Sequence, residues 1–356
     1  MTICLVGSEM CIRDRIKHPL APLMIIAGAG TGKTFTLENR IIYMIQQYGV
    51  KPDSILTITY TEKAAKELKS RLHEKIGQKV HPMFVGTFHS FCYKLMKDYQ
   101  INNADSFLLI DQSEAVHLML ENYDDFTPLM SEEFSINPKI SVVESFIPFF
   151  NRLRDELVDI DKVDQSIIKN FYEDDAESFD QLNDLLRIFP IYQNLKKENN
   201  LIDYNDMILD TFHALKNDTR LLEKVQSKYE HLIIDEFQDN NYALNEISRL
   251  ISKKNRSITV VGDDDQVIYS FRGANAFNIS TFEKTYESHP NYEMITLETN
   301  YRSSQPILDL ANHSIKHNKE RKIKSLVSAG KNIEIKPMIF MGEKNEQIEF
   351  IANEII

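Results

Sequence analysis

The sequence predicts an α/β protein that is built around a parallel β-sheet and interrupted by a helical insertion. Several short apolar runs are bounded by turn or polar residues and are too short for helices, which is typical of buried strands in a parallel sheet. These runs are Leu23–Ile26, Ile55–Ile58, Leu232–Ile234 and Ile258–Val261. Helical patterns alternate with them, so we expect functional residues at the carboxyl ends of the strands.

The first helical patterns each have one apolar face. Phe35–Tyr48 places Leu37, Ile41, Met44 and Ile45 on a single face. In Lys63–Ile76 the inward positions are Ala64, Leu68 and Leu72, while the basic residues lie elsewhere. Such faces pack against a sheet, so both segments are predicted to be helices that cover it.

The middle of the chain differs from its two ends. Residues 91–200 are helix-like, acidic and free of glycine, so we expect an insertion in a first α/β domain formed by residues 16–90 and 201–280. After Pro290, a strand-like Met294–Leu297 and a helix from Pro306 predict the start of a second α/β unit within residues 281–356.

Residues 1–15 have an unusual origin in our interpretation. Cys4–Arg15 reads CLVGSEMCIRDR, which reverse-translates into a transposase sequencing adapter. We therefore expect residues 1–15 to be an assembly artefact and native sequence to begin near Ile16. The alternative is a natural N-terminal helix.

Composition indicates a soluble globular protein. Of the 356 residues, 42% are hydrophobic and 26% are charged, and no apolar run approaches the length of roughly 20 residues that crosses a bilayer. We expect a cytoplasmic protein without membrane contact. The net charge of −12 weighs weakly against nucleic acid, but a local basic or aromatic track is sufficient for DNA. The cysteines Cys4, Cys11 and Cys92 have no metal-ligand spacing.

The strongest chemical signal is a phosphate-binding loop between a strand-like run and a helix. It consists of Ala27, Gly28, Ala29, Gly30, Thr31, Gly32, Lys33 and Thr34. Glycines let backbone amides turn toward phosphate oxygens, and the following helix adds its positive end. Lys33 would reach the β- and γ-phosphates of ATP, and the Thr34 hydroxyl would bind Mg²⁺. Ala27 departs from the general pattern, which begins with glycine.

A second signal is the carboxylate pair Asp235-Glu236, which directly follows the apolar run Leu232–Ile234. A carboxylate at the end of a neighbouring strand can hold Mg²⁺ opposite the loop, and the adjacent one can deprotonate the attacking water. We assign Asp235 to the metal and Glu236 to the water. Together the two signals predict a nucleotide hydrolase.

Further segments resemble the motifs of UvrD/Rep-type (superfamily-one) DNA helicases, in the family's order. They are Thr57–Ala65 (motif Ia), Gly86–Ser90 (Ib), Leu201–Asp206 (re-entry after the insertion), Asp235–Asp239 (II), Val261–Ala274 (III) and Asn300–Ser303 (IV). The resemblance implies a RecA-like first domain, a helical insertion and the start of a second RecA-like domain. It also implies an ATP-dependent motor on single-stranded DNA and duplex junctions that moves 3′ to 5′ in DNA repair or replication.

The resemblance also implies roles for single residues. Gln266 would sense the γ-phosphate, Arg302 would act as an arginine finger, and Tyr301 would stack on the adenine. The expected DNA contacts are hydroxyl, basic and aromatic side chains, about half of which should touch DNA. They are Thr59, Tyr60, Thr61, Phe88, His89, Tyr269, Phe271 and Arg272.

Some family features are missing from the sequence. The place of the upstream glutamine motif for adenine is taken by the suspected adapter, Phe35 stands where relatives often have arginine, and motifs V and VI are absent. We therefore expect the chain to be a fragment that hydrolyses ATP very slowly by itself. Alternatives are the motor part of a helicase–nuclease, a DNA-dependent ATPase that translocates without unwinding, and a non-catalytic relic. The oligomeric state stays open.

Overall fold

A six-stranded parallel sheet forms the centre of the computed structural model, which describes residues 16–267, 277–319, 321–330 and 340–355. The strand order is β3-β2-β6-β7-β1-β8. The strands are β1 (Leu23–Ala27), β2 (Ile55–Ile58), β3 (Phe84–Gly86), β6 (His231–Ile234), β7 (Ser257–Gly262) and β8 (Glu293–Leu297). The predicted α/β class with a parallel sheet is confirmed.

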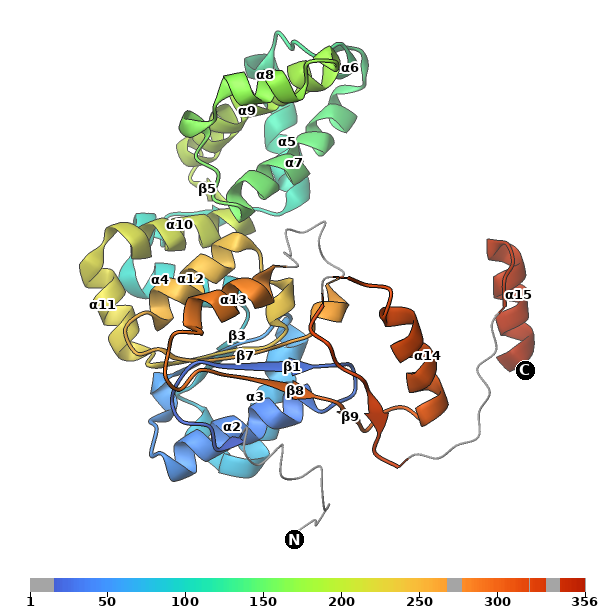
Figure 1. Cartoon of the computed structure of the whole chain (residues 1–356). Coiled ribbons are helices and arrows are strands. Elements are labelled where there is room, and N and C mark those ends of the chain that lie inside the picture. The colour runs from blue at the N-terminus through green and yellow to red at the C-terminus, as the bar shows by residue number, and fades with distance from the viewer. Residues whose placement is uncertain (1–15, 268–276, 320, 331–339, 356) are drawn as a thin grey trace.

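Helices cover both faces of this sheet, so its four central strands, β2, β6, β7 and β1, are buried on two sides (Figure 1). Side chains alternate along β1: Leu23 and Ile25 pack toward one face, and Met24 and Ile26 pack toward the other. The first face is covered by α2 (Lys33–Gln47) and α3 (Glu62–Ile76). The second face is covered by α4 (Phe88–Tyr99), α10 (Tyr204–Asn217), α11 (Thr219–Lys228), α12 (Tyr242–Ser252) and α13 (Asn278–Tyr286).

The insertion is a separate helical lobe with its own core, at the top of Figure 1. Its helices are α5 (Gln112–Glu121), α6 (Glu132–Ile136), α7 (Lys139–Asp155), α8 (Gln165–Phe171) and α9 (Ala176–Glu198). The chain leaves through β4 (Leu108–Leu109) and returns through β5 (Leu201–Ile202), and these two strands pair in parallel. Among the described residues, no helix has both the length and the apolar character to span a membrane.

The lobe begins later than the sequence indicates. We expected the insertion to start at residue 91, but Phe91, Cys92, Leu95 and Met96 of α4 pack into the core between the sheet and the helices of its second face. The first residue that belongs to the core of the lobe is Ile110. A helical pattern marks α4 as a helix without showing which core it joins, and this is why the expected boundary is too early.

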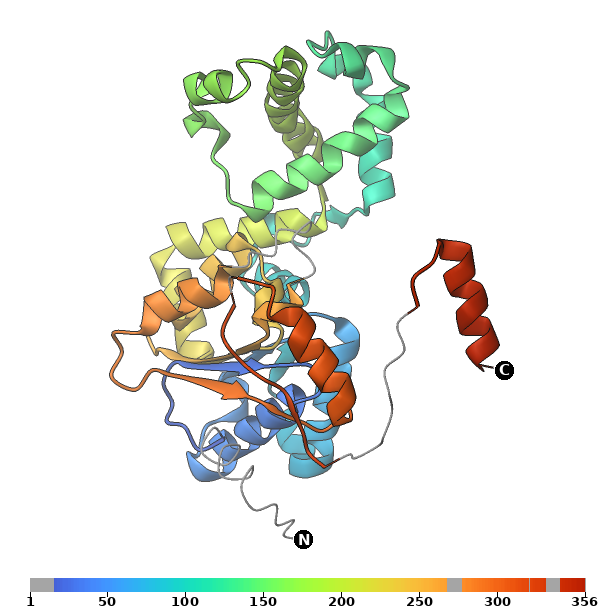
Figure 2. The same ribbon diagram turned by 45° about the vertical axis from the view of Figure 1, so that its right-hand side comes forward.

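The expected second unit also begins later. β8 pairs in parallel with β1, with Leu23 opposite Glu293 and Ala27 opposite Leu297, so this strand extends the first sheet. Beyond it lie β9 (Thr299–Asn300), α14 (Gln305–Ile315), β10 (Val327–Ser328) and α15 (Lys344–Ile355). β9 and β10 pair with each other, and α15 stands apart from the sheet in Figures 1 and 2.

Candidate functional site

The glycine-rich loop connects β1 to α2 and has the geometry expected of a phosphate cradle. Gly30 and Gly32 have φ angles of 75° and 86°, in the left-handed region that favours glycine. The Thr31 hydroxyl donates to the Gly28 carbonyl at 2.8 Å and closes the turn. Gly32 is the N-cap of α2 and brings no capping side chain, so the first-turn amides are available to an anion.

The two carboxylates after β6 lie opposite this loop, as predicted. The Lys33 ammonium is 2.6 Å from a Glu236 carboxylate oxygen, so the residues of the two signals meet. The backbone N–H of Asp235 donates to Ile58 of β2 at 2.9 Å. Burial, followed by the charge of Glu236, raises the pKa of Asp235 to about 6. Its carboxylate would therefore gain from a nearby cation.

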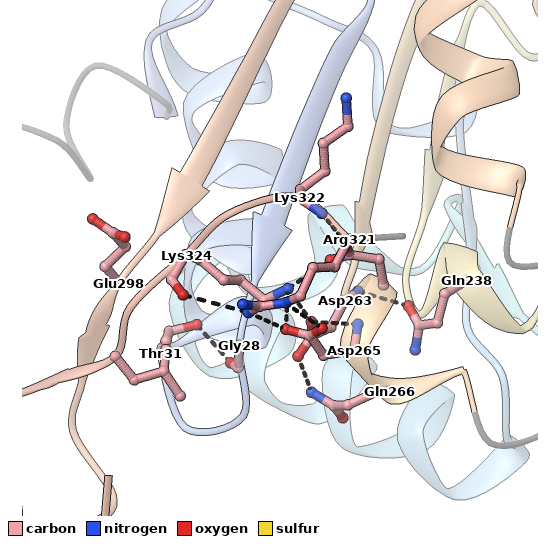
Figure 3. Close-up of polar contacts among 12 residues, drawn as sticks. Gly28, Thr31, Gln238, Asp263, Asp265, Gln266, Glu298, Arg321, Lys322 and Lys324 are labelled. Carbon is pink, nitrogen blue, oxygen red and sulfur yellow. Dashed lines mark hydrogen bonds and ion pairs between the residues drawn. The ribbon is translucent and has the colours of Figure 1, made fainter. Parts of the chain in front are cut away.

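Gln238 is a further site residue, which the sequence interpretation overlooked. Its side-chain amide donates to the Glu236 carboxylate at 2.9 Å, and its carbonyl accepts from the backbone N–H of Asp263 at 2.9 Å. Figure 3 shows this second bond. Gln238 thus ties the end of β6 to the end of β7. The position of Gln238 within motif II was the sequence signal that could have identified it as a site residue.

Gln266 lies where the prediction places it, just beyond the carboxyl end of β7. Its side-chain amide donates to the carboxylate of Asp263 (Figure 3). Its backbone N–H donates to the Asp263 carbonyl at 3.0 Å. The orientation of Gln266 therefore depends on how the Asp263 side chain is held.

Motif IV docks directly on the phosphate-binding loop. The Tyr301 backbone N–H donates to the Gly30 carbonyl at 2.9 Å, and the Asn300 amide donates to the Ala29 carbonyl at 2.6 Å. A Cβ placed on Gly30 would lie only 2.7 Å from the Cβ of Arg302. Tyr301 and Arg302 are thus beside the loop, and Asn300, which we did not select, holds them there.

The expected DNA contacts fall into two groups. Thr61 is exposed, and Tyr60 and His89 line a cavity near the base of the insertion. Tyr204 lines the same cavity and packs edge-to-face on His89, with ring centroids 5.9 Å apart. Burial lowers the pKa of His89, which favours its neutral form.

Two of the expected contacts are instead structural. Phe88 is 6% exposed and belongs to the core between the sheet and the helices of its second face, so its ring has no free face for a base. Thr59 is buried, and its hydroxyl donates to the Thr61 carbonyl at 3.1 Å. A motif match does not show which of its side chains point inward. Tyr269, Phe271 and Arg272 lie outside the described residues.

Comparison with known proteins agrees with this arrangement of nucleotide-binding motifs. The family model of the UvrD/REP helicase N-terminal domain matches residues 11–287, and that of the UvrD-like helicase C-terminal domain matches residues 295–356. The chain belongs to the UvrD/REP helicase family.

Its relatives include two staphylococcal proteins that are both named ATP-dependent DNA helicase PcrA. The one from Staphylococcus aureus is 32% identical and the one from Staphylococcus epidermidis is 34% identical, each over 346 residues. These alignments cover 96% of this chain and 44% of each relative, so the chain spans less than half the length of the relatives it matches.

Proposed function

We propose that this chain carries the nucleotide-binding site of a motor that hydrolyses ATP to move along single-stranded DNA and to separate duplex strands. The observation that carries the proposal is the ion pair between Lys33 and Glu236, because it joins the phosphate-binding loop to the carboxylates after β6. Membership of the helicase family and the name of the relatives, ATP-dependent DNA helicase, support the same activity.

Lys33 and Glu236 would exchange partners during the reaction. Because ATP offers several anionic oxygens, we expect Lys33 to turn from Glu236 toward the β- and γ-phosphates when the nucleotide binds. Glu236 then accepts a proton from the attacking water, while the new bond from that water to γ-phosphorus replaces the bond to the ADP oxygen. Gln238 donates to the same carboxylate and keeps it oriented.

Thr34 and Asp235 are the residues that we propose to hold Mg²⁺. A hydroxyl and a carboxylate are ligands that suit this ion, and Asp235 is a carboxylate whose raised pKa, about 6, reflects burial and the nearby Glu236. The chemistry that Mg²⁺ supplies when bound is neutralisation of charge on the β- and γ-phosphates. Arg302 would stabilise the same charge, and Tyr301 would stack on the adenine.

The DNA would pass over the carboxyl end of β2 and the start of α4. Tyr60 and His89 offer ring surfaces that stack bases of any sequence, and Thr61 offers a hydroxyl for a phosphate. Movement in the 3′ to 5′ direction and a place in DNA repair or replication are part of the proposal, and their support is the resemblance of the motifs to the family.

The test is the variant Glu236→Gln, which keeps the shape of the side chain and removes the base. Single-turnover hydrolysis of Mg-ATP, with protein in excess, quantifies even slow chemistry. We expect the rate to fall by about 10² or more, while nucleotide affinity stays similar. Glu230→Gln changes an exposed carboxylate before β6 and is the matched control. Hydrolysis by Glu236→Gln at the parent rate would show that Glu236 is not the base.

A further inference from the structure

Asp263, Asp264 and Asp265 form an acidic cluster directly after β7. Their carboxylate oxygens lie within 4.8 Å of one another, and the described part of the chain has no other group of three or more His, Cys, Asp or Glu residues this close together. Three carboxylates this close would repel one another without cations between them. The cations come from a distant segment, residues 321–328, which we call the strap.

Lys324 of the strap occupies the centre of the cluster (Figure 3). Its ammonium lies 2.9 Å from Asp263, 2.5 Å from Asp264 and 2.7 Å from Asp265, and its side chain is only 2% exposed. A protein cation therefore lies between the three carboxylates. Burial disfavours the Lys324 ammonium, but hydrogen bonds to the three carboxylates outweigh burial and raise its pKa.

Other strap residues strengthen the contact. The Arg321 guanidinium donates to both oxygens of Asp265, at 2.8 and 2.7 Å. The backbone N–H of Lys322 donates to Asp264. Bidentate and charge-assisted hydrogen bonds of this kind fix geometry as well as charge. The cluster is thus held from one side by a single segment.

The same strap also touches the phosphate-binding loop. A Cβ placed on Gly28 would lie 2.7 Å from the side chain of Leu326, so the strap packs closely against this loop. β10, the last part of the strap, pairs with β9, and Asn300 of β9 bonds to Ala29. The strap therefore connects the phosphate-binding loop, motif IV and the acidic cluster.

We propose that Lys324 is a positioning residue that holds Asp263 so that Gln266 faces the γ-phosphate. Asp263 accepts from the Gln266 amide through one carboxylate oxygen and contacts Lys324 through the other. Without Lys324 the carboxylates repel, Asp263 moves, and the Gln266 amide loses its support. This inference rests on the proposed function, because it concerns recognition of the terminal phosphate of ATP.

The test compares Lys324→Met with Lys322→Met in the complete chain. Lys322→Met is a matched control because it also removes one cation from the strap. The Lys322 ammonium pairs with Glu283 and not with the cluster. Affinities for Mg-ADP and for a non-hydrolysable Mg-ATP analogue are measured by titration. For Lys324→Met we expect a loss of about tenfold for the triphosphate, the scale of one charge-assisted hydrogen bond, with ADP affinity unchanged within about twofold.

Two further measurements separate positioning from general loss of structure. Hydrogen exchange of residues 263–266 should be faster in Lys324→Met and unchanged in Lys322→Met. Lys324→Arg keeps the cation and should restore part of the preference for triphosphate. If Lys324→Met does not fold, Lys324→Gln gives the same test, because it removes the cation that contacts Asp263 and keeps a polar side chain at this position.

The outcomes distinguish this inference from the proposed function. If the wild-type chain prefers the triphosphate and Lys324→Met or Lys324→Gln has the same preference, the positioning role alone is overturned. Equal affinities of the wild-type chain for Mg-ADP and for the Mg-ATP analogue would also overturn the positioning role alone. A wild-type chain that binds neither nucleotide overturns the proposed function, and this inference with it.

Discussion

At the scale of single residues, the site depends on backbone conformations that residues other than glycine rarely adopt. Glu236 has a φ of 50°, in the left-handed region, although it is not glycine. Such conformations are uncommon and cluster at functional sites, where the surrounding structure maintains them. Here the surroundings are Lys33 and Gln238, which both contact the Glu236 carboxylate. Two side chains thus hold the carboxylate of Glu236, which we propose as the base.

Tyr204 provides a residue-scale prediction for DNA binding. It is 50% exposed, lines the cavity with Tyr60 and packs on His89. We expect Tyr204→Ala to weaken binding of a labelled single-stranded oligonucleotide by roughly 1–3 kcal/mol, the value of one stacked base. Fluorescence anisotropy gives this affinity.

Tyr48→Ala is the control for that measurement, because Tyr48 is 41% exposed at the end of α2, on the other face of the sheet. Equal affinities of wild type and Tyr204→Ala, or an equal loss in Tyr48→Ala, would show that bases do not stack in this cavity. Affinity should also fall as salt is added, because phosphate contacts release counterions.

At the scale of elements, the buried strands were the most predictable part of the fold. Ile55–Ile58 is β2 with the same bounds, and Leu23–Ile26 and Leu232–Ile234 each fall one residue short of β1 and β6. Continuous apolar runs identify such strands because both of their faces are buried. β3 was overlooked because Phe84–Gly86 is short and partly exposed. β8 was recognised as a strand, but its sequence does not show which sheet it joins.

Contacts between distant elements could not be predicted. The phosphate-binding loop, Asp235 and Glu236 were selected correctly as neighbours, because the carboxyl ends of parallel strands share one edge of the sheet. Lys324 and Gln238 were not selected, because their importance comes from partners that only the folded chain brings near. Phe88 shows the opposite error, since its motif was recognised while its burial in the core was not.

The junction between α7, α9 and α10 gives a prediction at the scale of elements. Arg154 of α7 contacts Asp203 and Asp206 at 2.7 Å each, and Lys196 of α9 contacts the same carboxylates at 2.8 and 2.6 Å. Burial opposes ionisation of Asp203, but Arg154 and Lys196 outweigh it and hold its pKa well below the ordinary value. These buried charges fasten the insertion to the sheet domain.

We expect Arg154→Met to lower the free energy of unfolding by about 3–5 kcal/mol, because it leaves two carboxylates with one cation. Denaturant unfolding measures this change. Arg152→Met is the control on the same helix: Arg152 is 48% exposed and pairs with Glu156, so its loss should change stability by about 0.5 kcal/mol. A small effect of Arg154→Met, similar to that of Arg152→Met, would mean that the network does not stabilise the junction.

At the scale of the whole molecule, both proposed binding surfaces lie at the carboxyl ends of the parallel strands. The phosphate-binding loop follows β1 and the DNA candidates follow β2, while β6 and β7 lie between them in the sheet. The Asp235 N–H donates to Ile58 of β2, and Gln238 links Glu236 to Asp263 after β7. Short hydrogen-bonded connections thus link the proposed DNA surface to the proposed nucleotide site.

Nucleotide binding by the phosphate-binding loop is the claim on which the whole account depends, and a titration of the chain with a fluorescent ATP analogue in the presence of Mg²⁺ tests it most directly. We expect saturable binding by the wild type and a loss of about tenfold or more in Lys33→Ala, because the loop loses the cation that would contact the β- and γ-phosphates. Lys51→Ala, an exposed position before β2, should bind like the wild type. Equal binding by Lys33→Ala and wild type, or no binding by either, would contradict the account.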